Sequence, residues 1–218
     1  IILLISWIGY QHALDGAGQF AMAVFEGNNW RQEYHGRPPL RPAVCVGQIL
    51  QHEKLEDGRY NVLVQGVCRA KILHELPASE DRLYRAAYLE PVGIVDTRED
   101  MDALEGEQIM AAHGTTPHLE FARARLREML SDGPLSNLAA ASYVLNYLQK
   151  DEFHTSALLE VVSFTLIGDP ALRYRLLAEP VADKRADLIL KELDYLTELI
   201  RKAQRQRPED WPKGCSWN

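Results

Sequence analysis

The chain contains residue types that could act as a nucleophile, a base or a phosphate ligand, but not at the spacing that such chemistry needs. Ser142 and Lys150 could serve as a nucleophile and its base, yet any protein of 218 residues offers a pair of this kind. A phosphate-binding loop requires Gly-x4-Gly-Lys-Ser/Thr between a strand and a helix. The similar run at 213–216 lies in the terminal tail and has no strand before it. We therefore predict neither ATP hydrolysis nor peptide cleavage by these residues.

Two histidines five residues apart, His113 and His118, are the strongest hint of a metal site. Helical zinc-binding pairs place their histidines four residues apart on one face, and here Gly114 and Pro117 intervene. A solvated loop between helices explains the pair better. The acidic pairs at 100 and 102 and at 105 and 107 fit the first turn of a helix, where carboxylates complement the helix dipole. We predict no metal ion and no cofactor.

Composition and charge argue against several special classes of protein. Hydrophobic residues make up 46% and charged residues 25% of the chain, as in an ordinary globular protein. The net charge of −7 argues against a nucleic-acid binder, which needs a basic surface. The apolar start, 1–5, is too short to cross a membrane. Three cysteines without a Cys-x-x-Cys pair indicate neither a disulfide framework nor a zinc site, and they suit the cytoplasm.

The run from 46 to 72 has the pattern of a β-hairpin. Apolar-rich segments flank Asp57-Gly58, a dipeptide that favours a tight two-residue turn. A two-residue loop at this position pairs Leu55 with Tyr60, and every other pair of the hairpin follows from that register. We therefore expect two strands in an antiparallel pair that is buried on one side.

This register divides the hairpin into a drier and a wetter face. The drier face includes Cys45 and Cys68, which we expect to be buried thiols rather than a functional pair. The wetter face is mostly polar, and its few apolar members are Val46, Leu50, Leu63 and Val67.

The hairpin also carries a set of residues that resembles the N-terminal substrate-recognition domain of Lon-type ATP-dependent proteases. The resemblance rests on Val46-Gly47-Gln48-Ile49, Asp57-Gly58-Arg59-Tyr60-Asn61, Gln65-Gly66 and Arg69. It continues more weakly in the segment 158–199, with Arg173, Leu176-Leu177 and Arg185. It implies structural roles for Gly47, Asp57, Gly58, Arg59, Tyr60, Gly66 and Arg69. The family's first strands have no counterpart in residues 1–12, which implies that they are missing or altered here.

The rest of the sequence predicts strands first and helices afterwards. We expect strands at 19–25 and 85–95 and, after Asp96, helices at 100–113, 117–130, 136–148, 156–167 and 170–178 and from 183 onward. Cap-then-proline signatures open two of these helices at Thr116 and Asp169, and we expect Thr155 to cap another. The predicted fold class is α+β, with a β-rich module at 1–96, a helical module at 97–207 and a tail at 208–218. The resemblance implies that these modules are a PUA-like pseudo-barrel and a helical bundle.

The resemblance implies a non-enzymatic module that binds proteins or peptides, whereas the residues alone indicate only a globular protein without a visible active site. The expected partners are unfolded or extended polypeptide segments and a separate protease, in the cytoplasm, with no nucleic acid and no membrane. Trp30, Tyr34 and Arg37 form a candidate binding surface, and ordinary packing of their proline-rich loop is the alternative. Two other readings of the chain stay open: an N-terminal fragment of a complete ATP-dependent serine protease, and a regulatory partner of a separate protease.

Overall fold

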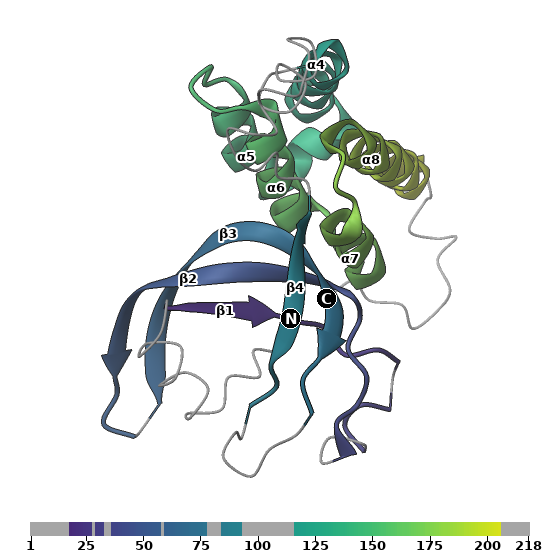
Figure 1. Cartoon of the computed structure of the whole chain (residues 1–218). Coiled ribbons are helices and arrows are strands. Elements are labelled where there is room, and N and C mark those ends of the chain that lie inside the picture. Colours follow the sequence, from purple (N-terminus) through teal and green to yellow (C-terminus); the bar gives the residue numbers. More distant parts are fainter. Residues whose placement is uncertain are drawn as a thin grey trace, which may run out of the picture. The chain divides into compact units, whose positions relative to one another are not determined.

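The computed structural model divides the chain into two compact units, Ile1–Ile94 and Val95–Asn218 (Figure 1). The structure describes residues 18–27, 29–32, 36–57, 59–77, 84–92 and 116–205. Several predictions lie outside these residues: the altered start at 1–12, the helix at 100–113, the tail at 208–218 and the positions of Tyr34, Gly58 and His113. The two units are described separately below.

The first unit is an antiparallel sheet of four strands in the order β1-β2-β3-β4 (Figure 1). The strands are β1 (Gln19–Met22), β2 (Ala43–Lys54), β3 (Tyr60–Glu75) and β4 (Ala87–Val92). With the helices of the second unit, they confirm the α+β class. The pseudo-barrel is not confirmed, because the four described strands form an open sheet whose outer strands, β1 and β4, do not pair with each other.

The hairpin of β2 and β3 exists, but the predicted register was wrong by one residue. Lys54 pairs with Tyr60, and the backbone N–H of Leu55 donates to the carbonyl of Arg59 at 2.8 Å. The loop inside this bond spans 56–58, three residues instead of the predicted two, and the extra residue shifts every pair. Two further irregularities interrupt the ladder, between Val46 and Gly47 and between Ile49 and Gln51.

These shifts also overturn the prediction of one continuous dry face. Val44 and Ala70 are paired and buried, and farther along β2 Ile49 is buried opposite Val64. Positions 44 and 49 are five residues apart on one strand, so their side chains point to opposite sides of the sheet. The drier side therefore changes along the hairpin.

The two cysteines of the hairpin do not share a face as predicted. Cys45 pairs with Arg69, whereas Cys68 pairs with Val46. Because neighbours along a strand point to opposite sides, Cys45 and Cys68 lie on opposite faces. Both are free thiols and are half-buried rather than buried.

The second unit is a bundle of helices. Its elements are α4 (Pro117–Ser131), the short 3-10 helix η2 (Pro134–Asn137), α5 (Ala141–Leu148), α6 (Thr155–Leu166), α7 (Pro170–Ala178) and α8 (Ala182–Arg205). The two cap-then-proline predictions are confirmed. Thr116 Oγ1 accepts from the N–H of Leu119 at 3.1 Å, and the Asp169 carboxylate accepts from the N–H groups of Ala171 and Leu172 at 3.0 and 3.2 Å.

Two other helix predictions were wrong in detail. The helix expected at 136–148 is divided into η2 and α5, because Pro134 opens a short 3-10 turn that ends before Ala141. Thr155 is not the cap of α6 but its first residue, and the position before it is His154. The Thr155 hydroxyl is buried without a hydrogen-bond partner among the described residues, so it gives α6 no capping bond.

The bundle is organised around one hydrophobic core to which each of the helices named above contributes. Its largest fully buried side chains are Leu126, Leu130, Leu135, Val144, Leu148, Leu158, Leu159, Val162, Ile167, Ile189 and Leu193. In the apolar stripe predicted for the last helix, Ile189 and Leu193 are buried, while Leu196 and Ile200 pack at the margin of the core.

Arginine side chains satisfy the backbone carbonyls at the carboxyl ends of three of these helices. Arg123, only 6% exposed, donates to the carbonyls of Leu148, Lys150 and Phe153 at and after the end of α5. Arg173 donates in the same way to carbonyls at the carboxyl end of α6, and Arg185 donates to carbonyls just after the end of α7. These contacts join helix ends to neighbouring helices and so hold the bundle together.

Candidate binding surface

Three irregularities in the sheet each leave one residue without a partner in the ladder, and each of these residues is a large aliphatic one. Leu50 falls between the pairs Ile49–Val64 and Gln51–Leu63. Val67 and Leu73 fall in the same way at the other two irregularities, both on β3. We call Leu50, Val67 and Leu73 the bulge residues. Since a β-bulge turns a side chain out of the regular pleat, the bulges decide where these apolar groups point.

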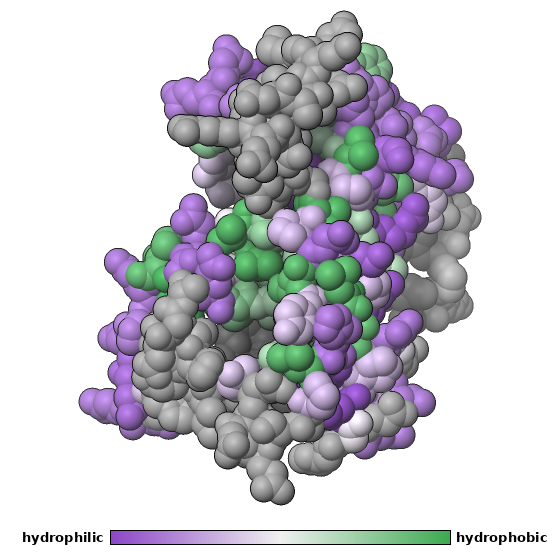
Figure 2. Space-filling view, in the orientation of Figure 1, coloured by the Kyte–Doolittle hydropathy of each residue, from purple (hydrophilic) through white to green (hydrophobic). Residues whose placement is uncertain are grey.

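The bulge residues lie largely in solvent. Leu50, Val67 and Leu73 are 53%, 51% and 56% exposed, and nearby Leu63 and Tyr88 are exposed to a similar degree. Single exposed hydrophobic residues are common, but here they recur on three adjacent strands of one sheet. Figure 2 shows hydrophobic residues, in green, gathered over the area that the sheet occupies in Figure 1. The sheet thus presents apolar side chains that no described residue covers fully.

The proline-rich loop, with two of the three residues of the predicted binding surface, is closed at its base. Phe25 forms a β-bridge with Leu40, and the N–H of Arg41 donates to the carbonyl of Val24 at 2.8 Å. Trp30 stacks on Phe25 with ring centroids 5.2 Å apart and an interplanar angle of 19°. The Arg31 guanidinium carbon lies 5.2 Å from the Trp30 ring centroid.

Arg37 is held at another point of the same loop. Its guanidinium lies 3.7 Å from a carboxylate oxygen of Glu75 and donates to the carbonyl of Leu76 at 3.4 Å. Arg85 makes two hydrogen bonds to the same Glu75 carboxylate, at 2.7 and 2.5 Å, and a third to the carbonyl of Pro38. Trp30 and Arg37 therefore have separate contacts in the loop. A shared surface of Trp30, Tyr34 and Arg37 stays a prediction.

The residues of the Lon-like motif make backbone and packing contacts in the hairpin. A Cβ atom added at Gly47 would lie 2.6 Å from Val64 Cγ1, so a side chain has no room there. Gly66 is the partner of Gly47 in the ladder, Tyr60 that of Lys54 and Arg69 that of Cys45. At the turn, the Asp57 carboxylate accepts hydrogen bonds from Arg59 Nε at 2.7 Å and from the Arg59 N–H at 3.0 Å.

Two of the groups considered for catalysis or metal binding, Lys150 and His118, have other contacts. Lys150 Nζ lies 5.7 Å from the centroid of the Tyr147 ring, and His118 Nε2 lies 2.9 Å from Asp187 Oδ1. In the ranges that the structure describes, no three His, Cys, Asp or Glu side chains gather closely enough to hold a metal ion. No helix in those ranges is both long and apolar enough to cross a membrane.

Comparisons with known proteins give a family model and a solved structure. A family model described as the ATP-dependent protease La (LON) substrate-binding domain matches residues 8–195. Among solved structures, the chain is similar to the N-terminal domain of Mycobacterium avium complex Lon protease. The two are 13% identical, with a TM-score of 0.48, and the match covers 80% of this chain and 90% of that one. No curated protein matches the chain.

Proposed function

Because the chain belongs to the family of ATP-dependent protease La (LON) substrate-binding domains, we propose that it binds extended or unfolded segments of protein substrates through the exposed apolar residues of its sheet. The single observation that carries the proposal is the coincidence of all three sheet irregularities with an exposed aliphatic side chain. A folded protein hides most of its aliphatic side chains, whereas an unfolded segment offers them. Selectivity for unfolded protein follows from that difference.

The free energies of such contacts predict that binding is weak and readily reversed. Covering a half-exposed leucine or valine contributes roughly 1 kcal/mol, on the scale of about 25 cal/mol per Å² of apolar surface. Ordering a flexible polypeptide opposes this gain. A few such contacts alone correspond to an affinity of roughly millimolar order. Backbone hydrogen bonds to a strand added at the sheet edge would bring the affinity toward roughly micromolar order, which suits a module that must release one segment and take another.

In this proposal the chain contributes recognition and no chemistry of its own, and a separate protease in the cytoplasm is its partner. The two half-buried free thiols are compatible with a reducing compartment. If the chain instead forms the first part of a complete protease, the binding role of the sheet is the same. Trp30, which is half-buried and stacks on the buried Phe25, is a second candidate contact, since the exposed part of an aromatic ring favours peptide side chains.

The test measures binding to one protein in two states. Fluorescence anisotropy compares native α-lactalbumin with its reduced, carboxymethylated form, which cannot refold. We expect measurable binding of the unfolded form only. Replacing two bulge residues, Leu50→Gln with Val67→Gln, should weaken that binding about tenfold, which corresponds to 1.4 kcal/mol.

A matched control removes one leucine and one valine elsewhere. Leu199 and Val181 are exposed residues of the helical unit, and Leu199→Gln with Val181→Gln should change affinity by less than about twofold. Equal losses in both double variants would contradict a role for the bulge residues. The same samples are assayed for ATP hydrolysis and casein cleavage, and turnover that survives repurification would contradict a purely binding role.

A further inference from the structure

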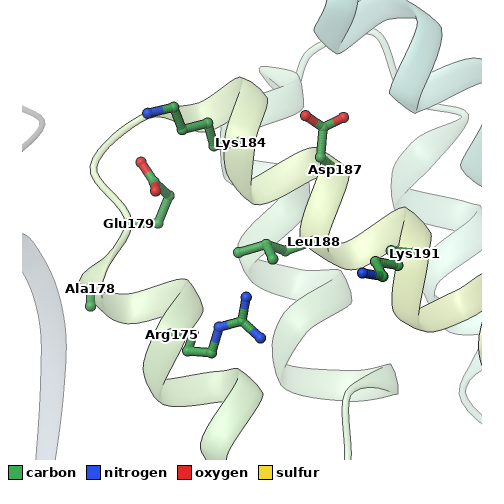
Figure 3. A pocket seen from close by; sticks show the side chains of 7 residues that line it. All are labelled: Arg175, Ala178, Glu179, Lys184, Asp187, Leu188 and Lys191. Carbon is green, nitrogen blue, oxygen red and sulfur yellow. The ribbon is translucent and has the colours of Figure 1, made fainter.

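An open groove lies between α7 and the first half of α8, with a volume of about 460 Å³ (Figure 3). Its lining residues are Arg175, Ala178, Glu179, Lys184, Asp187, Leu188 and Lys191. This volume is in the range of sites that hold small ligands or a few side chains. Three cations and two carboxylates line the groove. Whether it prefers an anionic or a cationic ligand therefore depends on which of these charges are already paired within the protein.

Both carboxylates of the groove are engaged elsewhere. Glu179 Oε1 accepts a hydrogen bond from the backbone N–H of Val181 at 2.9 Å. Asp187 Oδ1 lies 2.9 Å from His118 Nε2 on α4, within hydrogen-bond distance. Each acid therefore has a donor outside the set of lining residues, which reduces its capacity to pair with the cations.

The three cations differ from the carboxylates in this respect. Within the part of the chain that the structure describes, no hydrogen bond or ion pair engages the side chains of Arg175, Lys184 and Lys191. Figure 3 shows the Arg175 guanidinium and the Lys191 ammonium turned into the space beside Leu188, while Lys184 lies near Glu179 at the other end. The groove thus combines this positive charge with the aliphatic side chain of Leu188, which is half-buried between Arg175 and Lys191.

We propose that this groove binds an acidic polypeptide segment in which a carboxylate side chain lies next to an aliphatic one. The carboxylate pairs with Arg175 and Lys191, and the aliphatic side chain covers Leu188. A free phosphate ion would pair with the cations but would not cover Leu188. A long polyanion such as nucleic acid is disfavoured by the net charge of −7. The inference rests on the proposed function, because it names a class of polypeptide segment that the chain selects.

The test uses the full chain and three fluorescein-labelled peptides of nine residues at about 20 mM salt, where screening is weak. Glutamate and leucine alternate in the first peptide, glutamine replaces glutamate in the second, and alanine replaces leucine in the third. We expect the first peptide to bind at least about fivefold more tightly than either of the others. Backbone amide shifts in the NMR spectrum should move in α7 and α8.

Two double variants with the same loss of charge separate a specific site from general attraction. Arg175→Gln with Lys191→Gln should weaken the acidic peptide about fivefold. The control, Lys202→Gln with Arg205→Gln, removes two exposed cations from the last turn of α8, and should change affinity by less than about twofold. A further variant, Ala178→Glu, adds a carboxylate to the lining and should weaken binding even if the first variant fails to fold.

Three results would overturn the inference: equal losses in the two double variants, equal affinity for the glutamate and glutamine peptides, or competition by 10 mM inorganic phosphate with no difference between the leucine and alanine peptides. The last result would identify a simple oxyanion site. In each case the proposed function is judged independently, because the unfolded form of α-lactalbumin and the bulge-residue variant test the sheet. If the chain binds neither unfolded α-lactalbumin nor the acidic peptide, both proposals are contradicted.

Discussion

The two units of this protein differ in how much of their hydrophobic content forms a buried core. In the helical unit every helix contributes to one buried cluster, and arginines satisfy three of the helix ends. In the described part of the sheet unit, the buried hydrophobic residues are only Phe25, Val44, Ile49 and Ala70. Five large hydrophobic residues of the sheet are instead more than half exposed at or near its bulges, namely Leu50, Leu63, Val67, Leu73 and Tyr88.

The difference separates stability from recognition within one chain. A helix can bury its apolar stripe against other helices, and the helical unit does so although some of its large hydrophobic residues, such as Phe121 and Phe164, are also exposed. A sheet with bulges presents side chains on both sides and at angles that packing does not absorb. The helical unit thus has the features of a stable scaffold, and the sheet has the features that the proposed binding role requires.

The largest effect that distinguishes the units is the response to a buried charge. Leu193 has no exposed surface, so Leu193→Asp should lower the free energy of unfolding by about 3 kcal/mol or more. Leu63, 54% exposed on β3, should tolerate the same change at a cost below about 1 kcal/mol. Urea titrations followed by circular dichroism measure both. Lys191→Asp, on the exposed side of α8, is the control for added charge, and equal losses at all three positions would remove the contrast.

The next effect concerns the arginines that hold the helix ends. Arg123→Met keeps the aliphatic stem but leaves the carbonyls of Lys150 and Phe153 without their arginine donor, while the carbonyl of Leu148 keeps Arg127. Because partly buried carbonyls without a donor are costly, we expect a loss of roughly 1–3 kcal/mol. Arg125→Met, two residues along the same helix, removes only surface ion pairs with Glu128 and Asp194, and should cost under about 1 kcal/mol. A thermal midpoint that falls equally in both variants would contradict the structural role of Arg123.

A smaller effect tests how tightly the sheet packs at its centre. Gly47→Ala would place a Cβ atom 2.6 Å from Val64 Cγ1, and the strain should cost about 1–3 kcal/mol. Its ladder partner offers the comparison, since a Cβ atom at Gly66 meets nothing nearer than Cys45 Sγ at 4.0 Å. We expect Gly66→Ala to be nearly neutral in the same unfolding assay. Two neutral substitutions would mean that the sheet is loosely packed throughout.

The smallest effect lies at the exposed hairpin turn. The hydrogen bond from the Arg59 side chain, helped by that from the Arg59 backbone, lowers the pKa of Asp57 below 3.8. A lowered pKa means that the contact is fully present above about pH 3.8 and is lost as the pH falls through the lower value of the folded protein. An NMR titration of the Asp57 carboxyl should therefore have its midpoint below 3.8, and Arg59→Gln should return it toward 3.8. An unchanged midpoint in the variant would show that Arg59 is not the cause.

Local signals in the sequence were reliable guides to the helical unit. Thr116 and Asp169 were identified as caps because a capping side chain bonds to an N–H within three residues, so the whole motif is visible in a short stretch. The buried positions Ile189 and Leu193 followed from the helical period in the same way. The error at Thr155 has a similar explanation, since a helix boundary shifts by a residue when packing buries the hydroxyl instead.

The sheet was only partly predictable for the opposite reason. The hairpin and its turn region were visible in Asp57-Gly58, and the exposed members Leu50, Leu63 and Val67 were already marked as unusual apolar residues on a wetter face. No pattern in the sequence indicated that the loop would hold three residues. Nor did any pattern show that Leu50, Val67 and Leu73 would each fall outside the ladder.

The sequence by itself therefore determined the α+β class, the family, the capped starts of α4 and α7 and the buried positions Ile189 and Leu193 of the last helix. Only the tertiary structure decided the register, the three bulges, the side on which each strand is dry and the arginines that reach distant carbonyls. The physical reason is how far apart in the sequence the interacting groups lie. Caps and helical periods depend on groups a few residues apart, whereas pairing between strands and contacts between helices join residues that are far apart in the chain.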